Sequence, residues 1–181
     1  MVQKQTQKTT VIITTAAVFA SLVFVVTGLI PPITIPATSG YFNLGEPIIY
    51  IAALVFGPIV GGVAGGIGAS LADAYLGFAY FAPGTLIIKG FEGIIVGFLN
   101  VKLQKRIHNA TVCACIAVVC GGLEMVTGYF LYEQFVLGYP FAVALVEVPF
   151  NLVQMSIGLV IAVPVMHAVQ RVFPQLKSNA Y

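Results

Sequence analysis

The chain has 181 residues, of which 59% are hydrophobic and 8% charged, with eight Lys and Arg against six Asp and Glu. Soluble domains carry roughly 25% charged residues, so this composition excludes a water-soluble globular protein. It also excludes a large extramembrane domain, because six membrane-spanning helices of about 20 residues each would use most of the chain. The few basic residues form no cluster of the kind that binds nucleic acid, so no nucleic-acid partner is expected.

Apolar stretches separated by turn residues and charges predict six helices in a single integral membrane domain that covers residues 1–181. The first stretch ends at Pro31–Pro32, since proline cannot continue a helix, and Gly57–Pro58 separates the second stretch from the third. The second stretch is short for a full span. The predicted helices cover residues 10–30, 44–56, 58–76, 83–103, 110–132 and 141–172. The sequence therefore predicts an all-α, polytopic bundle of six transmembrane helices.

Basic residues flank the predicted helices at three places, and these places fall on one side of a six-helix membrane protein. The connections around 31–43, 77–82 and 133–140 carry no Lys or Arg. Because cytoplasmic segments are enriched in Lys and Arg, both termini are predicted to face the cytoplasm. The flanking basic residues are Lys4, Lys8, Lys102, Lys105, Arg106, Arg171 and Lys177.

Most acidic residues, in contrast, lie inside predicted helices. Only Glu133 falls in a predicted connection, and Lys89 is the single cation expected inside the membrane, because the other basic residues flank the spans. A charged side chain at the centre of a spanning helix costs about 2.5–3.5 kcal/mol on insertion scales, so such residues are rare without a partner or a function. The acidic residues within the helices are Glu46, Asp73, Glu92, Glu124 and Glu147.

Counted along each helix, five of these charged residues fall in the outer half of the bilayer, above nearly apolar inner halves. They are Glu46, Asp73, Lys89, Glu124 and Glu147. Glu147, Asn151 and Gln154 follow i, i+4, i+7 spacing and share one face of the helix 141–172. Lys89 could pair with Glu92 or with Asp73. The pattern predicts either a polar cup that is open to one side or a set of internal ion pairs between helices.

Aromatic and amide side chains lie at the same level as this cup. They are typical either of an interfacial belt or of a pocket for a small heterocyclic ligand. No metal site and no cofactor are predicted. The candidate substrate-binding residues are Asn43, Glu46, Asp73, Tyr80, Lys89, Glu92, Tyr129, Glu147, Asn151 and Gln154.

An ordered series of short motifs gives the chain a resemblance to a known family. The series reads NLGE, FGPxxG, LAD, KGxEG and ExPxNxxQ, and the similarity covers roughly residues 10–165. In this order the motifs resemble the substrate-binding S components of energy-coupling factor (ECF) vitamin transporters. The resemblance is to the riboflavin-type branch, which includes hydroxymethylpyrimidine, pyridoxine and cobalamin binders.

The resemblance implies a six-helix bundle in the cell membrane of a prokaryote, with the vitamin bound near the outer face beneath a lid from the first external loop. It also implies that the protein docks on a transmembrane T component carrying two ATPases and topples in the membrane to release its substrate. An AxxxA pattern in the first helix contacts the T component in such proteins, and Ala16 and Ala20 match it. The chain has no GxxxxGK[ST] phosphate-binding loop, so active uptake would need that external ATPase.

The acidic and amide side chains suit the amino, hydroxyl and ring-nitrogen groups of hydroxymethylpyrimidine or pyridoxine, with cobalamin or riboflavin as further possibilities. A solitary secondary transporter or facilitator is the alternative, although it would need polar groups in the inner half. An enzyme is not expected. Asp73 is the only Asp, which excludes a two-aspartate protease, and His108 and His167 lie far from the acidic cup.

Overall fold

The computed structural model describes the backbone of residues 2–38 and 40–178 and the side chains of residues 9–38 and 40–176. Most of this chain is helical, as predicted. The helices are α1 (Val2–Leu29), α2 (Glu46–Phe56), α3 (Pro58–Val63), the π-helix η1 (Ala64–Ala69), α4 (Ser70–Leu76), α5 (Ala82–Gln104), α6 (Ala110–Phe135), α7 (Phe141–Val172) and α8 (Gln175–Ser178).

Four helical stretches among the described residues are long and apolar enough to cross a membrane: Thr9–Leu29, Pro58–Leu76, Ala110–Phe135 and Phe141–Val172. Helix α5 has 23 residues, but it carries Lys89 and Glu92 near its middle. Helix α2 has 11 residues, about 16 Å of helix, which is too short to span a bilayer. The helical bundle is thus confirmed, and the count of six transmembrane helices stays a prediction.

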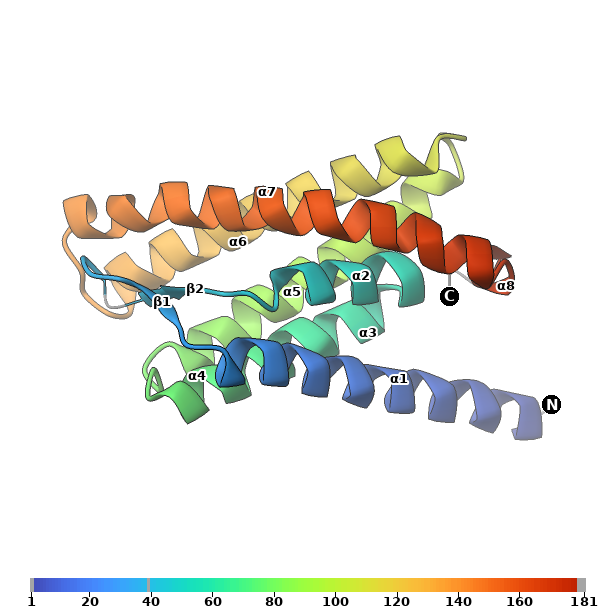
Figure 1. Cartoon of the computed structure of the whole chain (residues 1–181), viewed down its shortest axis with the longest axis horizontal. Coiled ribbons are helices and arrows are strands. Elements are labelled where there is room, and N and C mark those ends of the chain that lie inside the picture. The colour runs from blue at the N-terminus through green and yellow to red at the C-terminus, as the bar shows by residue number, and fades with distance from the viewer. Residues whose placement is uncertain (1, 39, 179–181) are drawn as a thin grey trace.

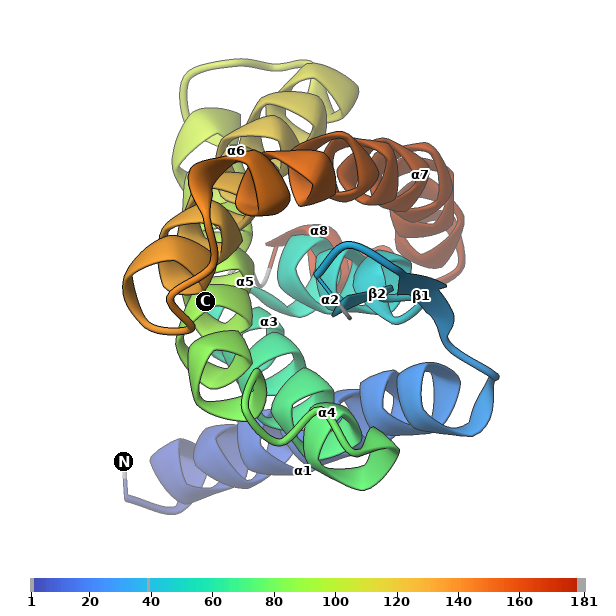
Figure 2. The same cartoon turned by 90° about the vertical axis from the view of Figure 1, so that its left-hand side faces the viewer.

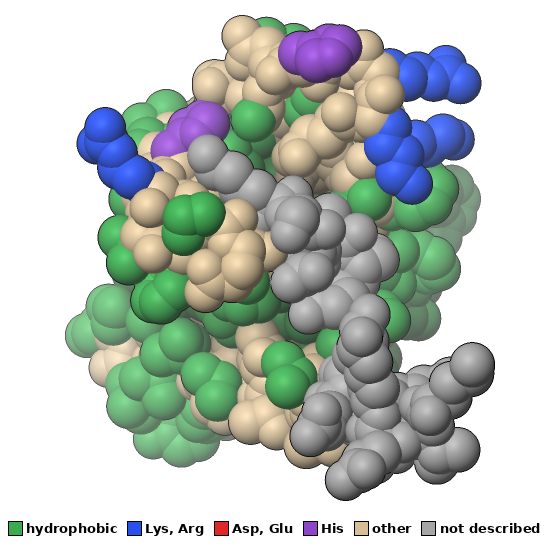
Figure 3. Space-filling model, turned by 90° about the vertical axis from the view of Figure 1, so that its right-hand side faces the viewer, with side chains coloured by type: hydrophobic (Ala, Val, Ile, Leu, Met, Phe, Trp, Pro, Cys, Tyr) green, Lys and Arg blue, Asp and Glu red, His purple; other side chains and the backbone are tan. Residues whose placement is uncertain are grey.

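The long helices run roughly side by side, and the ends of the bundle differ (Figure 1). We call the left-hand end in that view the hairpin end. It holds the connections 30–45, 77–81 and 136–140, whereas α8, the start of α1 and the α5–α6 connection lie at the opposite, terminal end. Lys and Arg side chains appear on the terminal end, and no acidic side chain of the described residues is visible there (Figure 3).

A β-hairpin that the sequence did not predict lies within the connection 30–45. Strands β1 (Ile33–Ile35) and β2 (Gly40–Phe42) pair antiparallel, with Ile33 opposite Phe42. Viewed from the hairpin end, α2 lies in the middle of the bundle with the hairpin in front of it, and the other long helices surround them (Figure 2). The hairpin therefore covers one end of the bundle interior.

Helix boundaries follow local chemistry. Gly57 has φ 89°, a left-handed conformation that glycine adopts without strain, and this residue together with Pro58 separates α2 from α3. The Asn109 side chain accepts a hydrogen bond of 3.2 Å from the Val112 amide and caps α6. Helix α6 continues to Phe135, so Glu133 belongs to a helix and not, as its sequence position suggested, to a connection.

The main apolar core fills the bundle between the hairpin end and the terminal end. Tyr50 and Val96, from α2 and α5, are fully buried within it, packed against small residues of α6 and α7. Gly93 of α5 and Gly61 of α3 bring their backbones into direct contact, because neither has a side chain to separate them. This close packing holds α5 directly against α3.

Candidate functional site

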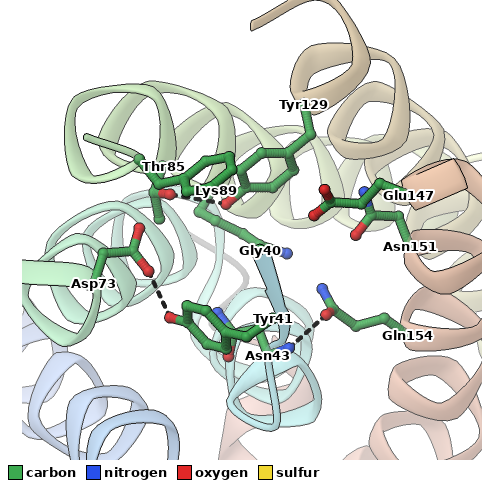
Figure 4. A pocket seen from close by; sticks show the side chains of 11 residues that line it. Gly40, Tyr41, Asn43, Asp73, Thr85, Lys89, Tyr129, Glu147, Asn151 and Gln154 are labelled. Atoms are coloured by element: carbon green, nitrogen blue, oxygen red, sulfur yellow. Dashed lines mark hydrogen bonds between the residues drawn. The ribbon is translucent and has the colours of Figure 1, made fainter. Parts of the chain in front are cut away.

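A polar cavity lies beneath the hairpin, between α4, α5, α6 and α7 (Figure 4). Its volume of about 30 Å³ is enough for about two water molecules. Carboxylate, amide, hydroxyl and ammonium groups converge on this small space. The lining residues are Gly40, Tyr41, Asn43, Asp73, Phe81, Thr85, Lys89, Tyr129, Glu147, Asn151 and Gln154.

The floor of the cavity is a buried ionic cluster. Lys89 is fully buried and its ammonium group forms ion pairs with Glu46 of α2 and, at 2.9 Å, with Glu92 of its own helix. The Tyr50 hydroxyl donates to the other oxygen of Glu92 at 2.8 Å. One ammonium group therefore faces two carboxylates, and no further Lys or Arg belongs to the cluster within the described chain. A cluster of this kind offers no spare positive charge to an anionic ligand.

Helix α7 supplies one wall of the cavity through residues one and two turns apart. Glu147, Asn151 and Gln154 all line it, as their spacing predicted. The Gln154 amide donates to Glu46 at 3.1 Å, and its oxygen accepts from the Asn43 backbone amide at 2.6 Å. Gln154 thus links α7 to the first turn of α2 and to the base of the hairpin.

Tyrosine hydroxyls hold the hairpin over the cavity. The Tyr41 hydroxyl donates to Asp73 at 2.5 Å, and the Tyr139 hydroxyl donates to the Thr38 carbonyl at 3.0 Å. Burial and the neighbouring Asp73 carboxylate raise the pKa of Tyr41 well above its usual range, so its hydroxyl remains a donor. At the base of the hairpin, the Asn43 side-chain oxygen accepts from Thr27 and from the Gly45 amide, both at 2.8 Å.

Several carboxyl oxygens around the cavity have no hydrogen-bond partner within the described part of the chain. Buried polar atoms are nearly always paired, so an unpaired acceptor beside a cavity indicates a missing donor. The atoms nearest the cavity are Asp73 Oδ2 and Glu147 Oε2. Glu46 Oε1 and both side-chain oxygens of Glu133 are also unpaired. These oxygens are acceptors that hydrogen-bond donors entering the cavity could reach.

The structure brings together seven of the ten residues proposed from the sequence at the cavity wall: Asn43, Asp73, Lys89, Tyr129, Glu147, Asn151 and Gln154. Glu46 and Glu92 lie behind Lys89 as its ion-pair partners. Tyr80 is 41% exposed and does not line the cavity. Its ring packs against Phe81 instead.

The ten residues proposed from the sequence did not include Glu133 beside the cavity or four residues of the cavity wall: Gly40, Tyr41, Phe81 and Thr85. Thr85, whose hydroxyl lies 3.0 Å from that of Tyr129, is one turn before Lys89 on α5, and i, i+4 spacing would have indicated it. Gly40 has no such signal, because its place depends on the hairpin. Glu133 is fully buried beside Glu147, and only the extra turn of α6 places it there.

Ala16 and Ala20, the proposed partner contacts, lie on the floor of an apolar groove. Their side chains are 4% and 9% exposed. The groove has a volume of about 730 Å³ and runs between α1 on one side and α3, η1 and α4 on the other. Gly68 of η1 packs against the backbone of Ala20, which keeps α1 close to the rest of the bundle.

The comparison with known proteins decides the family. The sequence profile described as "ECF-type riboflavin transporter, S component" matches residues 7–171. The chain belongs to this family of S components. The resemblance inferred from the ordered motifs is confirmed, and the protein is a component of a transporter and not an enzyme.

Two relatives of this S component cover most of its length. A protein of Pyrococcus woesei, described only as an uncharacterized protein in the gap 3' region, is 41% identical over 138 residues, which is 75% of this chain and 86% of that protein. The thiamine precursor transporter HmpT of Lactococcus lactis subsp. cremoris (strain MG1363) is 30% identical over 151 residues, 83% of this chain and 82% of its own. Together with the apolar helices, these findings identify a multi-pass membrane protein of a vitamin-type transport family.

Proposed function

We propose that this S component captures hydroxymethylpyrimidine or pyridoxine in the cavity beneath the hairpin and delivers it to ATP-driven uptake through a T component and two ATPase subunits. The unpaired buried oxygens of Asp73 and Glu147 at the cavity carry this proposal. Both ligands are small heterocycles with amino or hydroxyl donors that suit such acceptors.

The charge and size of the site favour some of the candidate substrates over others. HmpT is named for a thiamine precursor, and hydroxymethylpyrimidine is such a precursor. Lys89 is already bound to two carboxylates, so a phosphorylated or otherwise strongly anionic vitamin would find no free cation. Riboflavin and cobalamin are larger than the two proposed ligands and would require a greater expansion of the cavity.

The proposed orientation places the hairpin end outside the cell and the terminal end in the cytoplasm of a prokaryote. The Lys and Arg side chains on the terminal end (Figure 3) support this orientation, because cytoplasmic segments of membrane proteins are rich in both. In this orientation the cavity opens toward the medium from which a vitamin is taken up.

Substrate entry requires movement of the hairpin. A pyrimidine or pyridine ring does not fit in a space of about 30 Å³, and the hairpin is the element that covers this space. Tyr41 of the hairpin donates one hydrogen bond to Asp73 of α4. Tyr139, in the connection between α6 and α7, donates one to the Thr38 carbonyl of the hairpin. We propose that the hairpin is the lid that the family resemblance implies.

Binding to the purified protein tests the proposed substrate. Calorimetric titration with hydroxymethylpyrimidine and with pyridoxine should show binding of at least one of them, and tyrosine fluorescence gives a second readout because the chain has eight Tyr and no Trp. Asn151→Ala should weaken binding by about tenfold, the effect of losing one buried hydrogen bond of about 1.4 kcal/mol.

Ser156→Ala is the matched control for this titration. Ser156 lies on the same helix and is exposed, and its hydroxyl bonds to the Leu152 carbonyl of its own helix at 2.8 Å. This variant should bind like the unaltered protein. If neither compound binds the unaltered protein, the proposed substrate assignment is wrong.

The solitary transporter remains the alternative, and uptake assays separate it from the S component of a complex. Beyond the cavity the described core is mainly apolar, built around Tyr50 and Val96, and its buried amides include Asn100, which is bonded to the Leu54 carbonyl. This composition supports dependence on a partner. Cells that express this chain without a T component and ATPases should therefore accumulate no labelled vitamin. Uptake in those cells would favour the alternative.

A further inference from the structure

Two carboxyl groups of neighbouring helices meet at the side of the cavity. Glu133 in the last turns of α6 is fully buried, and Glu147 near the start of α7 is 5% exposed. Their carboxyl groups lie next to each other. Both side-chain oxygens of Glu133 and Oε2 of Glu147 have no hydrogen-bond partner among the described residues.

Glu147 is the member of the pair that reaches the ligand space. It lines the cavity together with Thr85 and Tyr129 (Figure 4), whereas Glu133 is not among the lining residues. The hairpin covers Glu147 directly, because a side-chain carbon at Gly40 would lie 2.6 Å from Glu147 Oε1. The pair is therefore closed off from water by the same element that covers the cavity.

Within the described residues, Lys89 is the one cation that lines the cavity beside this pair. The titratable groups nearest to it are the phenols of Tyr80 and Tyr139, with the Asp73 carboxylate across the cavity. Lys89 is bound to Glu46 and Glu92. No group of three or more metal-binding side chains is found among the described residues, so a metal ion would lack ligands.

Two adjacent buried carboxyl groups without a cation repel each other when both are ionised, and such pairs retain one proton between them. We propose that Glu133 and Glu147 share one proton in the empty site and that this proton passes to a ring nitrogen of the ligand. The O–H bond of the carboxyl pair breaks and an N–H bond forms on the heterocycle. The product is a heterocyclic cation held against two carboxylates.

This inference rests on the proposed function and narrows its substrate class. The site takes a neutral, weakly basic nitrogen heterocycle and holds it in its protonated form. An aminopyrimidine or a pyridine has such a ring nitrogen. Glu147 is the residue that contacts the ligand in this scheme, and Glu133 is a positioning residue that keeps the proton available to it.

Infrared spectra of the ligand-free protein test the shared proton without any ligand. The double variant Glu133→Gln with Glu147→Gln should remove a single carboxylic-acid band, because the pair holds one proton, while either single variant leaves one buried carboxyl group that can keep that proton. Loss of two bands in the double variant would mean that the carboxyl groups are protonated independently. That result, or no loss in the double variant, would overturn the inference.

Nitrogen-15 NMR of labelled hydroxymethylpyrimidine tests the transfer to the ligand. At a pH at which the free compound is neutral, its bound ring nitrogen should show the chemical shift of the protonated form. With Glu133→Gln the bound ring should stay neutral, and affinity should fall by about 10- to 100-fold because a charge-assisted contact is lost. Glu124→Gln, the same change on the same helix away from the cavity, should leave both readouts unchanged.

The outcomes separate this inference from the proposed function. If the unaltered protein binds the pyrimidine with a neutral ring, the proton transfer is wrong while vitamin capture stands. If the unaltered protein binds neither hydroxymethylpyrimidine nor pyridoxine, the proposed function fails, and the infrared comparison still decides whether the pair shares a proton.

Discussion

Lys89 is the side chain that neutralises buried negative charge in the interior. Its ammonium group lies between Glu46 and Glu92, and both carboxylates are almost fully buried. A buried charge is costly unless it is paired and hydrogen-bonded. The lysine therefore stabilises α2 against α5 through the two carboxylates that it neutralises.

Replacing Lys89 by Met should destabilise the protein by about 3–5 kcal/mol, because two buried carboxylates would lose their only cation within the described cluster. Thermal unfolding in detergent measures the effect. Lys102→Met, the same change near the terminal end of α5, should leave the unfolding temperature almost unchanged. Equal unfolding temperatures for both variants would show that the cluster contributes little to stability.

At the scale of elements, α5 and α3 approach closely because glycines meet between them. A side-chain carbon on Gly93 would overlap the Gly61 backbone, whereas one on Gly90 would find its nearest neighbours at 3.8 Å. These two glycines lie one turn apart on the same helix. Alanine substitutions at the two positions therefore distinguish a steric clash with α3 from the general effect of adding a methyl group to the helix.

Gly93→Ala should destabilise the protein by about 1–3 kcal/mol, because the added methyl group forces two backbones apart in a well-packed core. Gly90→Ala should have no such cost and should slightly favour the helix. Thermal unfolding of both variants under one detergent condition is the measurement. Similar unfolding temperatures would mean that α3 and α5 can separate freely.

The hairpin is the second element whose contacts can be tested. Tyr139 donates to the Thr38 carbonyl, and burial together with nearby Tyr80, Glu133 and Glu147 raises the pKa of its hydroxyl. The hydroxyl is therefore protonated and available as a donor at neutral pH.

Tyr139→Phe should increase the rate of ligand dissociation by about fivefold, since one net hydrogen bond of about 1 kcal/mol would no longer hold the hairpin closed. Stopped-flow fluorescence gives this rate. Tyr75→Phe is the control, because Tyr75 is exposed and lies on α4 outside the cavity. A dissociation rate that is equal in the two variants would contradict the role of the hairpin as a lid.

At the scale of the whole molecule, the apolar groove along α1 is separate from the polar cavity. The groove contains Ala16 and Ala20 and belongs to the α1 side of the bundle, whereas the cavity lies under the hairpin. Ligand capture and partner docking should therefore respond to different substitutions.

Ala20→Leu should abolish co-purification with the T component and ATPases while leaving ligand affinity within about twofold, because the larger side chain fills the groove floor and does not reach the cavity. Val18→Leu, on an exposed part of the same helix outside the groove, should leave both properties intact. Retained co-purification of the Ala20 variant would exclude this groove as the docking surface.

The sequence by itself determined the membrane class, most helix boundaries and the α7 side of the site. Composition requires burial in lipid, and the spacing of Glu147, Asn151 and Gln154 is a local property of one helix. The ordered motifs also identified the family, which the profile match confirmed.

Only the tertiary structure decided how these helices combine. The hairpin over the cavity and the central place of α2 depend on segments far apart in the chain, and the meeting of Glu133 with Glu147 depends on how α7 turns back against α6. Helical periodicity specifies which face of a helix is polar, but it does not specify which other helix that face meets. Lys89 could have paired with Asp73, and the packing of α2 against α5 selected Glu46 and Glu92 instead.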